Sequence, residues 1–240
     1  MRVMGAFLMF LAYVVLQTFV VVAHEHAHST AAWLLGYMPT PFTVIWGNPI
    51  TMRGWDEGVP YDQIFPKPGN LAEAVIGGIP LLMHTIFVVF SLALLLRTAS
   101  RFGAWLFFSL YWFVVINLAE LIAYIFMRPF ITTGDTGRFN AGMDLSPWLL
   151  FGSGTLFLLC ALWLLARRIG PKIDAFTDGS RFAHRSIVVA AAFVMFLWGS
   201  GIRMMSLYPD PQWKAGLVGI VGFVFWLLLD RSDLHPAGRA

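Results

Sequence analysis

The feature that most constrains the fold of this chain is a series of apolar runs, each close to the length of a membrane-spanning helix. A bilayer is crossed by about 20 mostly apolar residues. Of the 240 residues, 58% are hydrophobic and 12% are charged, whereas soluble domains carry about 25% charged residues. We therefore predict an all-α integral membrane bundle of about six transmembrane helices, with spans at 4–23, 72–96, 104–127, 147–166, 187–207 and 213–229.

The six spans are expected to form one domain over residues 1–240. The first helix is predicted to run on past its apolar run, over 4–36, and is followed by a polar segment, 37–70, and then by the remaining spans within 72–229. In the polar segment, two β-prone runs lie on either side of Gly47-Asn48-Pro49. This pattern is typical of a β hairpin, here over 42–55, which has to lie at the membrane surface or against the bundle.

The distribution of basic residues predicts the orientation. Alternate loops that share a side with the N-terminus hold ten Lys and Arg residues, and the opposite side holds five. The positive-inside rule then places both termini in the cytoplasm, and we expect a bacterial-type inner (plasma) membrane. The basic residues are scattered, so we expect the lipid bilayer and no nucleic acid as a partner. The ten are Arg2, Arg97, Arg101, Arg167, Arg168, Lys172, Arg181, Arg185, Arg231 and Arg239.

The chemistry is concentrated in the motif His24-Glu25-His26-Ala27-His28 on the first helix. Residues four apart lie on one face of a helix, so His24 and His28 can offer two imidazoles to one metal ion. Glu25 lies about 100° around the helix from His24, where its carboxylate can take a proton from water beside the metal. His26 points to the opposite face. Ionisable residues inside a membrane helix are costly and by default indicate function.

The motif and the segments after it resemble the site-2 protease family of intramembrane zinc metalloproteases. The resemblance consists of His24-Glu25-x-x-His28 on an N-terminal membrane helix that runs on to Gly36, a β-prone segment, and Gly77-Gly78-Ile79-Pro80 at the start of a later span. It covers mainly residues 20–140. It implies zinc as the cofactor, Glu25 as the catalytic residue and another membrane protein as the substrate. Strand addition to the segment at 42–55 is our hypothesis for how that substrate is held.

A catalytic zinc ion usually takes a third protein ligand. The resemblance implies Asp135, because Gly134-Asp135-Thr136-Gly137-Arg138 is similar to the Leu-Asp-Gly-Gly-Arg element of the family. The order of the spans agrees with this assignment. Odd-numbered spans run in the same direction, so the ends of the first and third spans reach the same side of the membrane. Glu120 is the alternative third ligand, or it does not bind the metal and instead holds one of the zinc-binding histidines in place. Asn117 is the counterpart of a family asparagine.

These residues predict a zinc-dependent intramembrane metalloprotease that hydrolyses peptide bonds of membrane proteins. Two alternatives stay open: a metal-binding transporter or sensor, in which His26 matters and Glu25 does not, and a non-catalytic scaffold that retains the fold. His84, in the second span, is interpreted as a hydrogen-bonded core histidine. The family generally has its catalytic end toward the cytosol, whereas the charge count places it on the opposite side.

Overall fold

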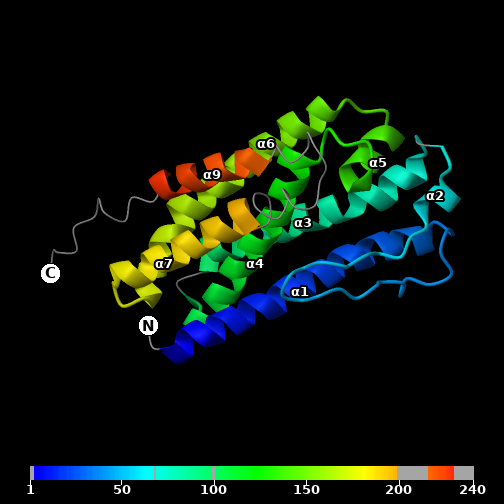
Figure 1. Cartoon of the computed structure of the whole chain (residues 1–240). Coiled ribbons are helices and arrows are strands. Elements are labelled where there is room, and N and C mark those ends of the chain that lie inside the picture. Colours follow the sequence, from blue (N-terminus) through cyan, green and yellow to red (C-terminus); the bar gives the residue numbers. More distant parts are fainter. Residues whose placement is uncertain (1–2, 68, 99–100, 199–215, 230–240) are drawn as a thin grey trace.

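The computed structural model describes residues 3–67, 69–98, 101–198 and 216–229. It is a bundle of long helices that run side by side (Figure 1). The helices are α1 (Val3–Leu34), α2 (Tyr61–Ile64), α3 (Leu71–Thr98), α4 (Ala104–Ile122), α5 (Gly134–Gly142), α6 (Pro147–Leu164), α7 (Arg181–Ala192) and α9 (Gly216–Leu229).

Several of these helices continue in a different helical form. A π-helical segment, η2 (Ala123–Met127), extends α4; η3 (Leu165–Ile169) and η4 (Gly170–Phe176) extend α6; and η5 (Phe193–Trp198) extends α7. Five of the resulting helices are long and apolar enough to cross a membrane, and a shorter apolar helix covers Leu217–Leu228. The prediction of a helical membrane bundle is thus confirmed in its class. Of the predicted span at 187–207, the part after residue 198 lies outside the described residues.

The helix that carries the histidine motif ends at Leu34 and is followed by a glycine cap at Gly36. Gly36 has a φ of +81°, its N–H donates to the carbonyl of Trp33, and the N–H of Tyr37 donates to the carbonyl of Ala32. This is the Schellman arrangement that ends many helices at glycine. The continuous helix therefore carries His24 and His28 about two to three turns before its end, with a rigid backbone on both sides.

The predicted β hairpin at 42–55 is not present. Within the described part of this segment, pairing is limited to one antiparallel bridge between Ile45 and Asp56. The Asn48 side chain accepts the N–H groups of Ile50 and Thr51, and Met52 has a φ of +54°. These turns use backbone donors that a ladder needs and bend the chain out of the extended conformation.

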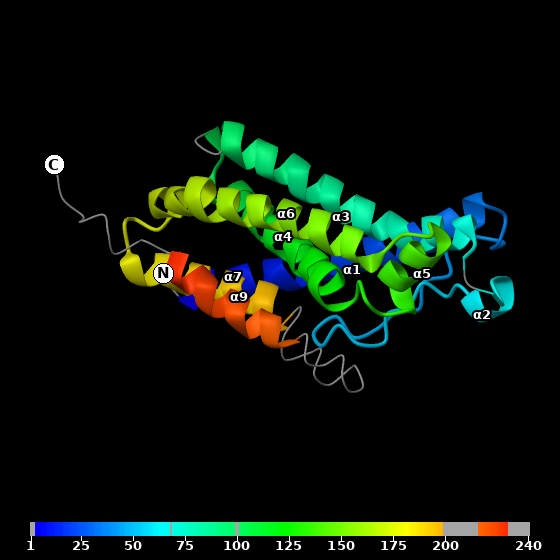
Figure 2. The ribbon, with the colours of Figure 1, turned by 90° about the horizontal axis from the view of Figure 1, so that it is seen from above.

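The centre of the bundle is α4, which packs mainly against α3, α1 and η5 (Figure 2). Large apolar side chains are exposed on the outside of the bundle, as expected where lipid is the solvent, for example Phe10, Phe19, Phe90 and Leu156. Polar side chains are buried inside, among them His24, His28, His84 and Asn117. Such inward polar groups need partners within the bundle.

Small residues bring α5 close to α3. A Cβ atom added at Gly77 would lie 2.9 Å from the carbonyl oxygen of Asp135, and one added at Gly78 would lie 2.5 Å from the ring of Phe139. Both glycines belong to α3, and both contacts are with α5. The Gly77-Gly78 pair therefore sets how near the start of α5, with Asp135, can come to the rest of the bundle.

We expect Gly77→Val to lower the unfolding temperature in detergent, because the new side chain forces α5 away from α3; overpacking of this kind costs about 1–3 kcal/mol. The matched control is Gly152→Val, since a Cβ at Gly152 meets no atom within 4 Å. Equal thermal stability of the two variants would contradict the close packing of α3 on α5.

Candidate metal centre

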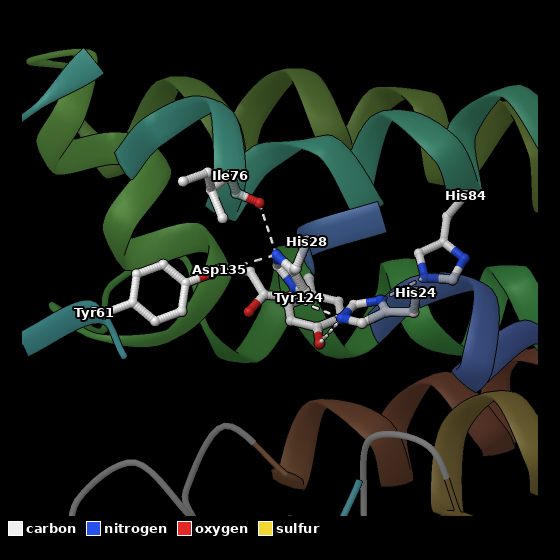
Figure 3. A network of polar contacts seen from close by, with 7 residues as sticks. All are labelled: His24, His28, Tyr61, Ile76, His84, Tyr124 and Asp135. Atoms are coloured by element: carbon white, nitrogen blue, oxygen red, sulfur yellow. Dashed lines mark hydrogen bonds and ion pairs between the residues drawn. The ribbon is translucent and has the colours of Figure 1, made fainter. Parts of the chain in front are cut away.

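Two imidazoles and one carboxylate meet between α1 and α5 (Figure 3). The Nε2 atoms of His24 and His28 lie 3.1 and 3.4 Å from Oδ2 of Asp135. Both histidines are buried, at 6% and 1% exposure, and their spacing of four residues puts them on the same face of α1. Two segments far apart in the sequence thus present three ligand atoms to one point.

Asp135 reaches this point from the first turn of α5. Two side chains that follow it in the same helix hold α5 in place. The Thr136 hydroxyl donates to the carbonyl of Arg128 at 2.7 Å. Arg138 donates to the buried Glu73 carboxylate of α3 at 2.7 Å and lies 3.8 Å from the centre of the Tyr61 ring. The carboxylate of Asp135 is therefore positioned by contacts on both sides of its own helix.

The ring of His28 is oriented by a backbone carbonyl that proline makes available. Nδ1 of His28 lies 2.6 Å from the carbonyl oxygen of Ile76, so this nitrogen carries the proton and donates it. In a regular helix the carbonyl of Ile76 would accept the N–H of residue 80, but Pro80 lies inside α3 and has no N–H. Pro80 of α3 thus leaves the carbonyl of Ile76 free to accept the hydrogen bond of His28.

The ring of His24 is oriented by a chain of buried side chains. Its Nδ1 lies 2.9 Å from Nε2 of His84, and Nδ1 of His84 lies 2.7 Å from Oδ1 of Asn117. The Asn117 amide donates to the carbonyl of Phe113 at 2.7 Å. That last bond makes Oδ1 the acceptor for His84, so His84 accepts from His24 in turn. The chain therefore leaves Nε2 of His24 as the available ligand atom.

With both Nδ1 protons donated away, the two Nε2 lone pairs face a carboxylate oxygen. Oδ2 of Asp135 is buried and has no hydrogen-bond donor. Burial by itself raises the pKa of Asp135, but His28 and His24, when their imidazoles are protonated, hold that pKa well below its ordinary value. A cation is needed at this point, either protons on the imidazoles or a metal ion. Two neutral imidazoles and a carboxylate are a donor set that suits zinc.

The residues fit a metal ion by distance as well. The ligand atoms of His24, His28 and Asp135 all lie within 4.8 Å of one another. Such proximity is what binding to a single ion requires, because metal–ligand bonds of about 2.0–2.2 Å limit how far apart ligands can be. Three protein ligands are also the number that leaves a position open in catalytic sites.

A cavity of about 200 Å³ adjoins the three ligands. Glu25 lines it, one residue along α1 from His24, and so do Glu57 and Trp55 from the segment after α1. Glu25, His28 and Glu57 form a second group whose ligand atoms lie within 4.8 Å of one another. The Glu25 carboxylate thus lies beside the candidate metal-binding point, where the ligand atoms of His24, His28 and Asp135 converge. It is not one of those three ligands.

The other residues predicted for the site lie around it in different roles. Glu120 lines the cavity and accepts a 3.4 Å hydrogen bond from Gln17, but it is in neither group of neighbouring ligand atoms found among the described residues. Asn117 hydrogen-bonds His84 on the side of the His84 ring away from His24. His26 faces away, with Nδ1 3.2 Å from the carbonyl of Pro41. His84 is fully buried and hydrogen-bonded, which confirms its interpretation as a core histidine.

Sequence patterns did not point to three residues of the site: Glu57, Tyr61 and Tyr124. The Tyr61 hydroxyl lies 3.5 Å from Nδ1 of His28, and burial raises its pKa well above the ordinary value, so it stays protonated. The Tyr124 hydroxyl lies 3.1 Å from Nε2 of His24. For Tyr124 a signal existed, since it follows Asn117 by about two helical turns along the same face.

Comparisons with known proteins leave the site to be interpreted from its own geometry. No protein-family model matches the sequence, and neither a curated protein nor a solved structure matches the chain.

We expect Pro80→Ala to weaken metal binding about tenfold, because residue 80 then has an N–H that competes with His28 for the carbonyl of Ile76. The measurement is Zn²⁺ affinity in detergent, by competition with a chromogenic chelator. Pro147→Ala is the control, since Pro147 lies at the start of α6. Unchanged affinity in Pro80→Ala would show that the orientation of His28 does not depend on the freed carbonyl.

We expect His84→Leu to weaken Zn²⁺ binding by about 10- to 100-fold, because the Nδ1 proton of His24 loses its buried acceptor. His84→Gln, which retains an acceptor oxygen, should recover part of the loss. His184→Leu is the control, since His184 is also buried but bonds Asp174. Zinc affinity in His84→Leu equal to that of the wild type contradicts the orienting role of His84.

Proposed function

We propose that this chain is a zinc-dependent intramembrane metalloprotease that hydrolyses peptide bonds of membrane-protein substrates. The observation that supports it best is the convergence of Nε2 of His24, Nε2 of His28 and Oδ2 of Asp135, with Glu25 lining the adjoining cavity. The histidine and glutamate side chains belong to a helix long and apolar enough to cross a membrane.

In this proposal His24, His28 and Asp135 hold the zinc ion. Bound zinc supplies a Lewis acid that acidifies water to a pKa of about 7 and polarises a peptide carbonyl. Glu25 accepts the proton of the attacking water and then delivers it to the leaving amine. His84 and the carbonyl of Ile76 keep the two imidazoles in the tautomer that leaves Nε2 available.

The alternatives differ from this proposal at Glu25 and His26. A transporter or sensor built on the three clustered histidines needs His26 among its ligands, whereas His26 contacts Pro41 on the side away from the cavity. A scaffold that retains the fold needs no carboxylate beside the metal. Glu25 lines the cavity, and this favours hydrolysis over both alternatives.

The metal is tested first. We expect about one zinc ion per chain in the purified protein, lost in His24→Ala and Asp135→Ala and retained in Glu120→Ala, as measured by elemental analysis of detergent-solubilised protein. Zinc retained in Asp135→Ala would remove Asp135 from the ligand set. A wild-type protein that takes up no zinc, even when zinc is supplied, contradicts the proposal.

The reaction is tested with Glu25→Gln. We expect this variant to retain zinc and to lose at least about 10²-fold in peptide-bond hydrolysis, because it lacks the proton acceptor. The assay is the appearance of new N-termini in membrane proteins co-reconstituted with the protein in liposomes, with a zinc chelator as a second control. New termini that appear equally with the wild type and with Glu25→Gln would mean that Glu25 does not catalyse their formation.

A further inference from the structure

The cavity beside the metal-binding point has few hydrogen-bond donors. Apart from the two ligand histidines, the described side chains that line it include three with N–H or O–H groups: Trp55, Tyr124 and Arg128. The indole N–H of Trp55 donates to the carbonyl of Asn48 at 3.3 Å. Tyr124 and Arg128 also line the cavity, the first with a hydroxyl and the second with a positive charge.

The asparagine suggested by the sequence is not in a position to do so. Both ends of the Asn117 amide are engaged, Oδ1 by His84 and Nδ2 by the carbonyl of Phe113. Asn117 is also fully buried, and it is not among the residues that line the cavity. A side-chain hydrogen bond to an oxyanion in this site therefore has to come from a different residue.

The Tyr124 hydroxyl points to the metal-binding point. It lies 3.1 Å from Nε2 of His24, beside the place where the three ligand atoms converge (Figure 3). Its ring stacks on the His24 ring, with centroids 5.5 Å apart and an angle of 15° between the planes. The guanidinium of Arg128 lies 4.4 Å from the centre of the Tyr124 ring. The ring thus contacts both a ligand histidine and a cation.

Tyr124 and Arg128 lie close together where α4 ends. Tyr124 belongs to η2 (Ala123–Met127), the π-helical segment that extends α4. A π turn has more residues than an α turn and so rotates the side chains that follow, and such segments are frequent at functional sites. Here Ala123, Tyr124 and Arg128 all line the cavity. The end of this helix therefore presents a hydroxyl and a positive charge to the same space.

We propose that Tyr124 is a catalytic residue whose hydroxyl donates a hydrogen bond to the oxyanion formed during peptide-bond hydrolysis, with Arg128 as its supporting cation. The proposal rests on the proposed function. When water adds to the peptide carbon, a C–O bond forms, the carbonyl oxygen takes the π electrons and Glu25 takes the proton. When the C–N bond breaks, the carbonyl re-forms and the amine receives that proton. Tyr124 keeps its own proton throughout.

The first test is Tyr124→Phe, which keeps the ring and removes the hydroxyl. We expect bound zinc to be unchanged, kcat for the Glu25-dependent cleavage to fall by about 10²- to 10³-fold, and KM to change little, because the hydrogen bond forms in the transition state. The matched control is Tyr111→Phe, since Tyr111 is buried in α4, the helix that η2 extends, and does not line the cavity. Full activity of Tyr124→Phe overturns the proposal, and so does loss of zinc, which would make Tyr124 a ligand.

The second test does not depend on turnover. The Co²⁺-loaded wild type and Tyr124→Phe are titrated with methylphosphonate, whose oxygens need hydrogen-bond donors, and with 2-mercaptoethanol, which binds through sulfur. We expect Tyr124→Phe to bind methylphosphonate at least about tenfold more weakly, a change typical of one lost charge-assisted hydrogen bond, and to bind the thiol equally well. The readout is the visible absorption of Co²⁺.

These outcomes separate the two proposals. Equal methylphosphonate affinity in the wild type and Tyr124→Phe, or equal weakening of both probes, overturns the role of Tyr124 while the metal centre and Glu25-dependent cleavage stand. A wild-type chain that takes up neither Zn²⁺ nor Co²⁺, or cleavage that does not depend on Glu25, overturns the proposed function itself.

Discussion

The candidate metal centre depends on which acceptors hold the Nδ1 protons of its two histidines. A histidine binds a metal through one nitrogen only if the other nitrogen carries its proton, and inside a bundle that proton needs an acceptor. Both acceptors here come from α3. The carbonyl of Ile76 takes the proton of His28, and the ring of His84 takes that of His24. If either acceptor were lost, the affected ring could turn or change tautomer, and the convergence of lone pairs on Asp135 would weaken.

The same helix also sets the position of the third ligand. Gly77 and Gly78 lie directly after Ile76 and admit α5 to close contact, while Glu73, about one turn earlier, binds Arg138 of α5. A carboxylate and a guanidinium that pair inside a protein cost free energy to desolvate, so such a pair serves geometry better than stability. One short stretch of α3 thus provides an ion pair, a free carbonyl, a close-packing surface and the proline that frees the carbonyl.

Sequence patterns could predict the parts of the site that follow from regular helix geometry. The spacing of His24, Glu25 and His28 gave their faces, and span parity put Asp135 at the same end of the bundle. The prediction of a hairpin was wrong because a periodic pattern does not show that the Asn48 side chain accepts backbone N–H groups that a β ladder needs. The π turn at Tyr124 could not be predicted for another reason: no spacing rule for a regular helix contains it.

The placement of polar groups separates structural roles from chemical ones. In a bundle surrounded by lipid, a polar side chain that supports the fold is expected to use its hydrogen-bonding capacity on protein partners. Asn117 and His84 follow that rule, since both polar ends of each are engaged behind the site. Glu25 and Tyr124 instead line a cavity with space for a further molecule. The polar groups that face this cavity are therefore the ones available to a bound molecule, and the division falls along α4 between Asn117 and the π turn that begins at Ala123.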